Sequence, residues 1–438
     1  MRFADNARLR PVAHAFVTLS PVPRKAALVF IFLVVLIDVL AFGLIIPVLP
    51  HLVEQFTGSK SQAALWIGIF GTVFAAIQFV CSPIQGALSD RYGRRPVILL
   101  SCLGLGLDFV IMALAPTLWW LLVARVFSGV FSASFTTANA YIADITPPEQ
   151  RAKSYGLVGA AFGVGFTIGP VLGGWLGEFD LRLPFWFAAA LALLNFFYGL
   201  FVLPESLAPS SRAKRFDWSA ARPHAAIGLI GRYPAIIGLA VVVFIANLAH
   251  YVYPSVFVLF ADVRYGWGPW QVGWVLFLVG VCSVIVNVAV VGRVVSAMGE
   301  RRALVFGLSC GVAGFLVYAF ASEGWMFLVG LPISALWAIA APASQALITR
   351  QVDVDMQGRI QGALMSLVSV AGIIAPIAFA SVFGLFISDR APVAFPGAPW
   401  MLAALLLLAG VLIAARYAPR TASRESTPID PGETPKDG

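Results

Sequence analysis

Long apolar runs, interrupted at short intervals by charged or turn-forming residues, follow one another along most of the chain. A helix that crosses the hydrocarbon core of a bilayer, about 30 Å thick, needs about 20 apolar residues. Runs of that size cover residues 26–49, 63–88, 96–115, 118–142, 154–176, 183–203, 234–260, 271–295, 303–321, 325–348, 359–385 and 396–416. The pattern therefore predicts an all-α membrane protein with twelve transmembrane helices.

Composition supports this prediction. Hydrophobic residues make up 60% of the 438 residues and charged residues only 11%, whereas soluble domains carry about 25% charged residues. The net charge of +8 comes from basic residues scattered between the apolar runs. It therefore indicates membrane topology rather than a nucleic-acid partner. The cysteines all lie within apolar runs and are expected to be buried hydrophobes, not disulfides or metal ligands: Cys81, Cys102, Cys282 and Cys310.

Basic residues between the runs are distributed unequally, and cytoplasmic loops are the ones enriched in them. If the N-terminus is cytoplasmic, the cytoplasmic segments hold Arg2, Arg8, Arg10, Arg24, Lys25, Arg91, Arg94, Arg95, Arg151, Lys153, Arg212, Lys214, Arg215, Arg222 and Arg232. The opposite side then holds only Lys60, Arg182, Arg264 and Arg390. This asymmetry predicts that both termini are cytoplasmic.

The two parts of the chain repeat each other. The stretch "GALSDRYGRRPVILL" from Gly86 has a weaker copy, "GRVVSAMGERRALVF", from Gly292. Likewise "YGLVGAAFGVGFTIGP", ending at Pro170, resembles "QGALMSLVSVAGIIAP", ending at Pro376, and both pairs are offset by 206 residues. The repeat predicts six-helix bundles over 26–203 and 234–416, a cytoplasmic loop over 204–233, and cytoplasmic ends at 1–25 and 417–438, the last disordered. Parallel repeats of this kind occur in transporters with a site near the membrane midplane.

Charge is concentrated in the turn "GALSDRYGRRP" between the second and third runs. It contains the residues Gly86, Asp90, Arg91, Gly93, Arg94 and Arg95. Glycines permit a tight turn and a close backbone approach. Charge at a membrane surface has no desolvation cost, so topology alone is one explanation. The other is a functional role for the turn.

Several motifs resemble the major facilitator superfamily, over nearly the whole chain. The turn "GALSDRYGRRP" resembles its loop between helices 2 and 3, "LVARVFSGVFSA" its helix 4 motif, and "GVGFTIGPVLGG" the helix 5 motif of proton-driven drug exporters. The stretches "LIDVLAFGLIIPVLP", "GLDFVIMA" and "APASQALITRQ" resemble the tetracycline/proton antiporter branch. The resemblance implies a cofactor-free exporter of a small amphiphilic compound that exchanges it for protons. It further implies a monomer in the bacterial inner membrane.

The same resemblance implies a role for the charged turn. The turn would face the start of helix 11, near Gly358 to Ile360, where Asp90 would meet the positive end of the helix dipole. Arg94 would reach Asp144 at the end of helix 4. We expect these contacts only when the two halves close on the cytoplasmic side.

The helix 5 motif comprises Gly165, Gly169, Pro170 and Gly173. Small residues four apart allow two helices to pack closely, and this role alone would account for the glycines. The family resemblance adds a bend at Pro170 that helps to seal the cavity. Both roles are compatible with the sequence.

Three charged residues lie away from the ends of the predicted helices, where a charge costs about 2.5 kcal/mol or more and indicates function: Asp38, Asp108 and Arg125. Asp38 lies near the middle of helix 1, where it is either a proton carrier or a hydrogen-bonding residue that packs against a neighbouring helix. Asp108 and Arg125 lie at similar depth on either side of the turn near Pro116. They are expected to form a structural ion pair or to take part in proton coupling, with Arg125 also a candidate to hold Asp38.

Polar residues at membrane depth are candidates for substrate binding, although some will only join helices: Gln78, Asn139, Asn247, His250, Asn287 and Gln345. They lie among 34 Phe and 12 Trp, a mixture that suits an amphiphilic ligand. Tetracycline exporters are expected to carry a histidine in helix 8 and an acid in helix 9. Here the corresponding windows offer Ser283 and Cys310, so proton coupling would depend on the first half.

Two other functions are weighed. A proton-coupled importer or a facilitator of a metabolite would share the fold. An intramembrane enzyme would need a catalytic cluster, but the histidines are scattered (His14, His51, His224 and His250) and the chain has neither an H-E-x-x-H nor a G-x-S-x-G motif at membrane depth. We therefore predict no catalytic residues and no metal site.

Overall fold

The computed structural model describes residues 24–132, 134–213, 231, 233–353, 356–389, 391 and 393–418. Within them lie twelve helices long and apolar enough to cross a membrane, which confirms the all-α prediction. The segment 1–23, most of the central loop and the tail beyond 418 lie outside the described residues. So do the predicted topology residues Arg2, Arg8, Arg10, Lys214, Arg215, Arg222, Arg232 and Arg390.

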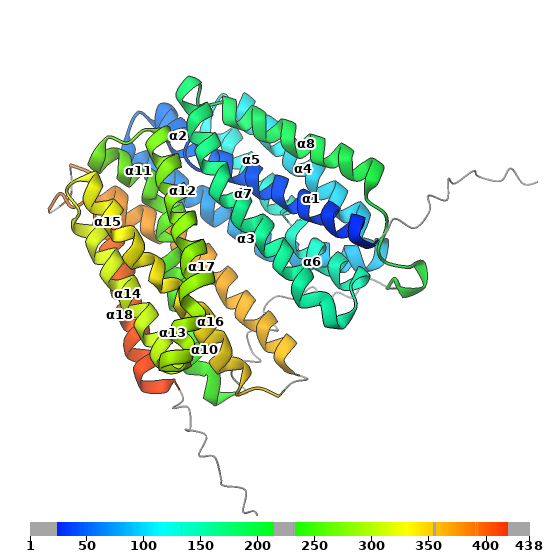
Figure 1. Cartoon of the computed structure of the whole chain (residues 1–438). Helices are drawn as coiled ribbons and strands as arrows, with labels where there is room; N and C mark the ends of the chain where they lie inside the picture. The colour runs from blue at the N-terminus through cyan, green and yellow to red at the C-terminus, as the bar shows by residue number, and fades with distance from the viewer. Residues whose placement is uncertain are drawn as a thin grey trace, which may run out of the picture.

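The helices form two groups, shown in Figure 1 from blue to green and from green to red. The N-terminal half contains α1 (Arg24–Ile45), α2 (Leu49–Thr57), α3 (Lys60–Tyr92), α4 (Arg94–Leu114), α5 (Leu118–Phe131), α6 (Ser134–Ile145), α7 (Arg151–Phe179) and α8 (Leu183–Val202). The C-terminal half contains α10 (Pro234–His250), α11 (Val252–Tyr265), α12 (Pro269–Ile285), the π-helix η3 (Val286–Val290), α13 (Val291–Met298), α14 (Glu300–Phe320), α15 (Gly324–Ala335), the 3₁₀ helix η4 (Leu336–Ile339), α16 (Ala340–Thr349), α17 (Gln357–Phe386) and α18 (Ala398–Tyr417).

The internal repeat is visible in the backbone. Gly93 precedes α4 with φ 108°, and Gly299 precedes α14 with φ 76°. These positions are 206 residues apart, the offset found in the sequence, and such a φ favours glycine. Pro170 inside α7 and Pro376 inside α17 are related by the same offset.

The first and fourth spans of each half are interrupted. The breaks fall between α1 and α2, at Ser132 after α5, at Tyr251 between α10 and α11, and in η4 between α15 and α16. Interrupted helices at corresponding positions of two repeats mark the binding site in many transporters, because the freed backbone groups need a polar or wet environment. The hydrophobic pattern alone did not predict these breaks.

The two halves touch at the end of the molecule that carries Gly58 and Gly266, which we call the closed end. There the Ser61 hydroxyl donates to the Gly384 carbonyl at 2.8 Å, and further along α3 the Thr72 hydroxyl donates to the Ile373 carbonyl at 2.9 Å. Between α7 and α12, the backbone at Gly174 packs directly on Pro269. The halves are therefore in van der Waals contact along α3–α17 and α7–α12.

At the other end, which carries the charged turn, the halves separate; we call it the open end. In the described part of the chain, no atom lies within 4 Å of the position that a side chain would take at Gly86 of α3 or at Gly358 and Gly362 of α17. The same is true of Gly159 and Gly163 on α7. The structure thus represents a state in which the halves contact each other at the closed end and lie apart at these positions of the open end.

The helix 5 motif serves close packing in this state. Gly165, Gly169 and Gly173 form one face of α7 against α1, where Gly173 approaches the Leu44 carbonyl. The Pro170 ring also lies beside Gly43 of α1, while its carbonyl oxygen lies beside Gly273 of α12. The glycines therefore have the packing role expected of small residues four apart, and α7 runs without interruption through Pro170.

Gly173→Ala is expected to destabilise the protein, because its Cβ would overlap the Leu44 backbone, which cannot rotate away. Overpacking of this kind costs about 1–3 kcal/mol. The measurement is thermal unfolding of the purified protein in detergent. Gly159→Ala on the same helix is the matched control, since open space surrounds that position. Equal melting temperatures for the two variants would contradict the packing assignment.

Candidate functional site

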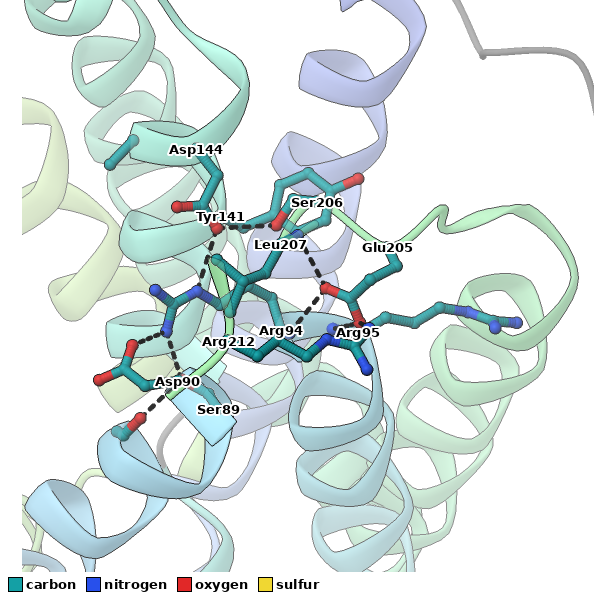
Figure 2. A network of polar contacts seen from close by, with 12 residues as sticks. Ser89, Asp90, Arg94, Arg95, Tyr141, Asp144, Glu205, Ser206, Leu207 and Arg212 are labelled. Carbon is teal, nitrogen blue, oxygen red and sulfur yellow. Dashed lines mark hydrogen bonds and ion pairs between the residues drawn. The ribbon is translucent and has the colours of Figure 1, made fainter. Parts of the chain in front are cut away.

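Arg94 is the centre of the charged turn, and Figure 2 shows its partners. Its guanidinium donates from Nε to Asp144 Oδ2 at 3.0 Å, and from Nη1 to Asp90 Oδ1 at 2.5 Å and Ser89 Oγ at 2.7 Å. The Ser206 hydroxyl also donates to Asp144, at 2.9 Å. Arg94 is buried, so its charge is balanced by carboxylates from α3 and α6.

Glu205, which the sequence analysis did not select, caps the start of α4. Its carboxylate accepts hydrogen bonds from the Arg94 amide at 2.8 Å, the Arg95 amide at 3.3 Å and the Leu207 amide at 3.0 Å. A carboxylate is favourable at a helix N-terminus. The same carboxylate fills the space beside Gly93 that a side chain would need, and this explains the glycine. The available signal in the sequence was an acidic residue just beyond the end of the predicted helix 183–203.

The contacts of the charged turn in this state lie within the N-terminal half and the central loop. The Asp90 carboxylate pairs with Arg94 of α4, and the Asp90 backbone carbonyl accepts a hydrogen bond from the Ala213 amide of the central loop. The pair between Arg94 and Asp144 is present, but it joins α4 to α6 within one half and so does not require the halves to close. Arg91 is exposed and lies over the Tyr92 ring at 5.2 Å.

Glu205→Ala is expected to lower the free energy of unfolding by about 1–3 kcal/mol, the cost of leaving polar groups unsatisfied. Three backbone amides would lose their shared acceptor. Arg91→Ala, in the same turn but exposed, is the control and should leave the melting temperature unchanged. The account of the turn would be wrong if both variants melted like the wild type.

Asp38 on α1 lies against α8 and α4. Its Oδ1 accepts a hydrogen bond from the Asn195 amide at 2.9 Å, and the Cys102 thiol lies 3.9 Å from the same oxygen. Asn195 is buried and also donates to the Val34 carbonyl at 3.0 Å. Sequence analysis missed Asn195, although a single asparagine in the apolar run of α8 is a signal of buried polar contact.

Asp108 and Arg125 form a buried ion pair. Arg125 Nη2 lies 3.5 Å from Asp108 Oδ2, and the Ser128 hydroxyl donates to the same oxygen. Asp108 is 0% exposed and Arg125 is 6% exposed. The ion pair recorded for Arg125 is therefore with Asp108 rather than with Asp38, and it fastens α4 to α5.

The polar substrate candidates are dispersed, and among the described residues no hydrogen bond joins two of them. Asn247 donates to the Val243 carbonyl at 2.8 Å, and Asn287 to the Ser283 carbonyl at 2.9 Å, each on its own helix. Gln78 and Asn139 are half-buried, whereas Gln345 and Asn287 are exposed. Asn287 lies in the π-helix η3, a type of segment common at functional sites.

His250 is the last residue of α10, directly before the break at Tyr251. The predicted run 234–260 placed His250 nearer to its outer end, whereas the span in the structure runs from Ile236 to Tyr265 and has His250 at its middle. Its ring lies 5.6 Å from the ring of Trp337, which belongs to η4, the break in the fourth span of this half. The breaks in the first and fourth spans of the C-terminal half thus lie next to each other, at the rings of His250 and Trp337.

Many of the aromatic residues pack on one another instead of lining a cavity. In the C-terminal half, Trp400 is fully buried and contacts the rings of Tyr253, Phe260, Phe315 and Tyr318. Aromatic content is therefore a poor measure of the ligand-facing surface in this chain.

Comparison with known proteins gives a consistent result. Residues 31–376 match the Major Facilitator Superfamily. The class C tetracycline resistance protein of Escherichia coli is 36% identical over 87% of this chain and 94% of the relative. The class B protein of the same organism is 34% identical over 80% of this chain and 86% of the relative.

The fold also matches a solved structure, that of the human organic anion transporter MFSD10 (TETRAN). The TM-score is 0.66 with 24% identity, over 90% of this chain and all of that chain. At this identity the match supports the fold alone. The chain belongs to the major facilitator superfamily: it is a multi-pass secondary transporter of small molecules, related to tetracycline efflux proteins, rather than an enzyme.

Proposed function

We propose that this transporter exports a small amphiphilic compound, tetracycline-like or multidrug, in exchange for protons by alternating access. The proposed location is a bacterial inner membrane, with both termini in the cytoplasm. The open end then faces the cytoplasm, and the structure corresponds to the state that accepts the compound for export. The names of the relatives, which are tetracycline resistance proteins, support this direction.

The observation that carries the proposal is the environment of Asp38. Its carboxylate lies at membrane depth against the Asn195 amide, and an amide has both a donor and an acceptor. The amide oxygen of Asn195 is itself buried, with no hydrogen-bond partner among the described residues. After rotation it could accept a hydrogen bond from protonated Asp38. Asn195 thus suits both protonation states of a proton carrier.

Asp108 suits a different role. Its carboxylate is already matched by Arg125 and Ser128, so protonation would leave a buried cation without its partner. We propose that this pair holds α4 and α5 together and that proton coupling depends on Asp38.

Substrate recognition is proposed where the interrupted spans of the C-terminal half meet, at the neighbouring rings of His250 and Trp337. Gln78, Asn139, Asn247, Asn287 and Gln345 remain candidates for contacts on the path to this point. Tetracycline exporters are expected to carry titratable side chains in helices 8 and 9. This chain has Ser283 and Cys310 there, which favours a compound other than tetracycline itself. An importer or facilitator of a metabolite is the alternative.

The proposal is tested in proteoliposomes that contain a pH-sensitive dye and an imposed proton gradient. Tetracycline, cationic dyes and other amphiphiles are added in turn. Dissipation of the gradient that depends on one of these compounds would support proton-coupled exchange. If none moved protons while a metabolite equilibrated without them, the facilitator would be the better assignment.

A further inference from the structure

Three groups of the kind that ligate metal ions meet at the closed end, far from Asp38 and the charged turn. His51 and Glu54 lie on α2, and Asp262 lies on α11. One possible ligand atom from each lies within 4.8 Å of those of the other two. All three side chains are half-buried, and they border a surface pocket of about 590 Å³ that also includes Glu178 and Gly268.

The cluster joins the two halves of the transporter. His51 and Glu54 belong to the N-terminal half, and Asp262 belongs to the C-terminal half. Lys60, the first residue of α3, forms an ion pair with Asp262 at 2.6 Å. These groups are adjacent only while the closed end is shut, so anything bound to all three would hold it shut.

His51 provides an independent sign of a missing ligand. Its Nε2 atom is buried and has no hydrogen-bond partner among the described residues. An imidazole nitrogen left in this condition costs free energy, and a neutral imidazole nitrogen is a common metal ligand. One imidazole with two carboxylates is a donor set suited to Zn²⁺.

Lys60 is the competitor for such an ion. Its side chain is 38% exposed, and a lysine on a flexible stem can turn away into solvent. Asp262 would then be free to ligate a metal ion.

We propose that Zn²⁺ binds between the halves through His51, Glu54 and Asp262, stabilises the state shut at the closed end, and thereby inhibits transport. Metal binding would require release of Asp262 by Lys60. The site is distinct from the proposed proton and substrate sites.

The first test measures thermal unfolding of the purified full-length protein in detergent with ZnCl₂ or MgCl₂. It needs no transported compound, so it is independent of the proposed export function. Zn²⁺ is expected to raise the melting temperature by several degrees, because a ligand that binds only the folded state stabilises it, whereas Mg²⁺ should have little effect. Glu54→Gln and His51→Gln should each raise the Zn²⁺ concentration for half the shift at least tenfold.

Lys60→Gln provides the test in the opposite direction, since removal of the competing ammonium should lower that Zn²⁺ concentration about fivefold. Glu323→Gln is the matched control, an exposed acid at the start of α15 outside the cluster, and should behave like the wild type. The proposal would be overturned if Zn²⁺ caused no shift, or if Glu54→Gln and Glu323→Gln responded at the same concentration. Melting temperatures without metal show whether each variant folds.

The second test measures substrate exchange in proteoliposomes. Zn²⁺ should slow exchange at least fivefold in the wild type and in Glu323→Gln, but not in Glu54→Gln. Stabilisation by Zn²⁺ without inhibition would overturn the claim that the ion locks the closed end.

Discussion

Asp38→Asn is expected to abolish uphill transport while leaving downhill exchange nearly intact. Asparagine has the shape of the acid but cannot carry a proton, so the coupling of proton and substrate movement would be lost. Its amide can still hydrogen-bond to Asn195, so the local packing should persist. The measurement compares concentrative uptake into energised everted vesicles with counterflow in proteoliposomes that have no gradient.

We expect uphill uptake to fall at least a hundredfold and counterflow to change by less than threefold. Asn195→Leu is the companion variant, since it removes the amide but leaves the acid. It should alter the pH dependence of uptake without abolishing it. Loss of both activities in Asp38→Asn, with normal folding, would assign Asp38 to substrate binding. Preservation of both would remove it from the mechanism.

Arg125→Leu is expected to cause the largest loss of stability, about 3–5 kcal/mol, the typical cost of leaving one charge of a buried pair unpaired. Asp108 is fully buried, and its recorded partners are Arg125 and Ser128. The double variant with Asp108→Leu removes both charges, and replacement of a buried pair by apolar residues is often neutral. It should therefore recover much of the stability lost in Arg125→Leu. Thermal and denaturant unfolding in detergent provide the comparison.

Recovery in the double variant without recovery of transport would mean that the pair has a role beyond structure. The single variant Asp108→Leu completes the comparison. If the stability loss of the double variant equalled the sum of the losses in Arg125→Leu and Asp108→Leu, the ion pair would be contradicted, because only the effects of independent residues add.

Hydrophobic patterning predicted the twelve spans because a bilayer demands length and apolarity from each one. The repeat aligns Gly93 with Gly299, and the structure gives both glycines a positive φ directly before a helix. The first predicted run ended at residue 49, however, whereas the structure continues through α2 to Thr57. The polar residues of α2 ended the run in the sequence, and they include the cluster residues His51 and Glu54.

The sequence could mark a polar residue as notable but could not give its tertiary partner. Asn195 became significant only when α8 was placed against α1, and Glu205 only when the central loop returned to the start of α4. The pairing of Asp108 with Arg125 was among the alternatives, since both lie at equal depth beside one tight turn. The separation of the halves at the open end follows from the conformational state, which residue patterns do not encode.

Proton release on substrate binding tests the central claim most directly. The purified protein in a weakly buffered detergent solution with a pH-indicator dye is mixed with the compound selected in the proteoliposome panel. If Asp38 exchanges a proton for substrate, the wild type should release protons on binding, and Asp38→Asn should bind the compound and release none. Equal proton release by the wild type and by Asp38→Asn would contradict the account and place the exchanged proton on another residue.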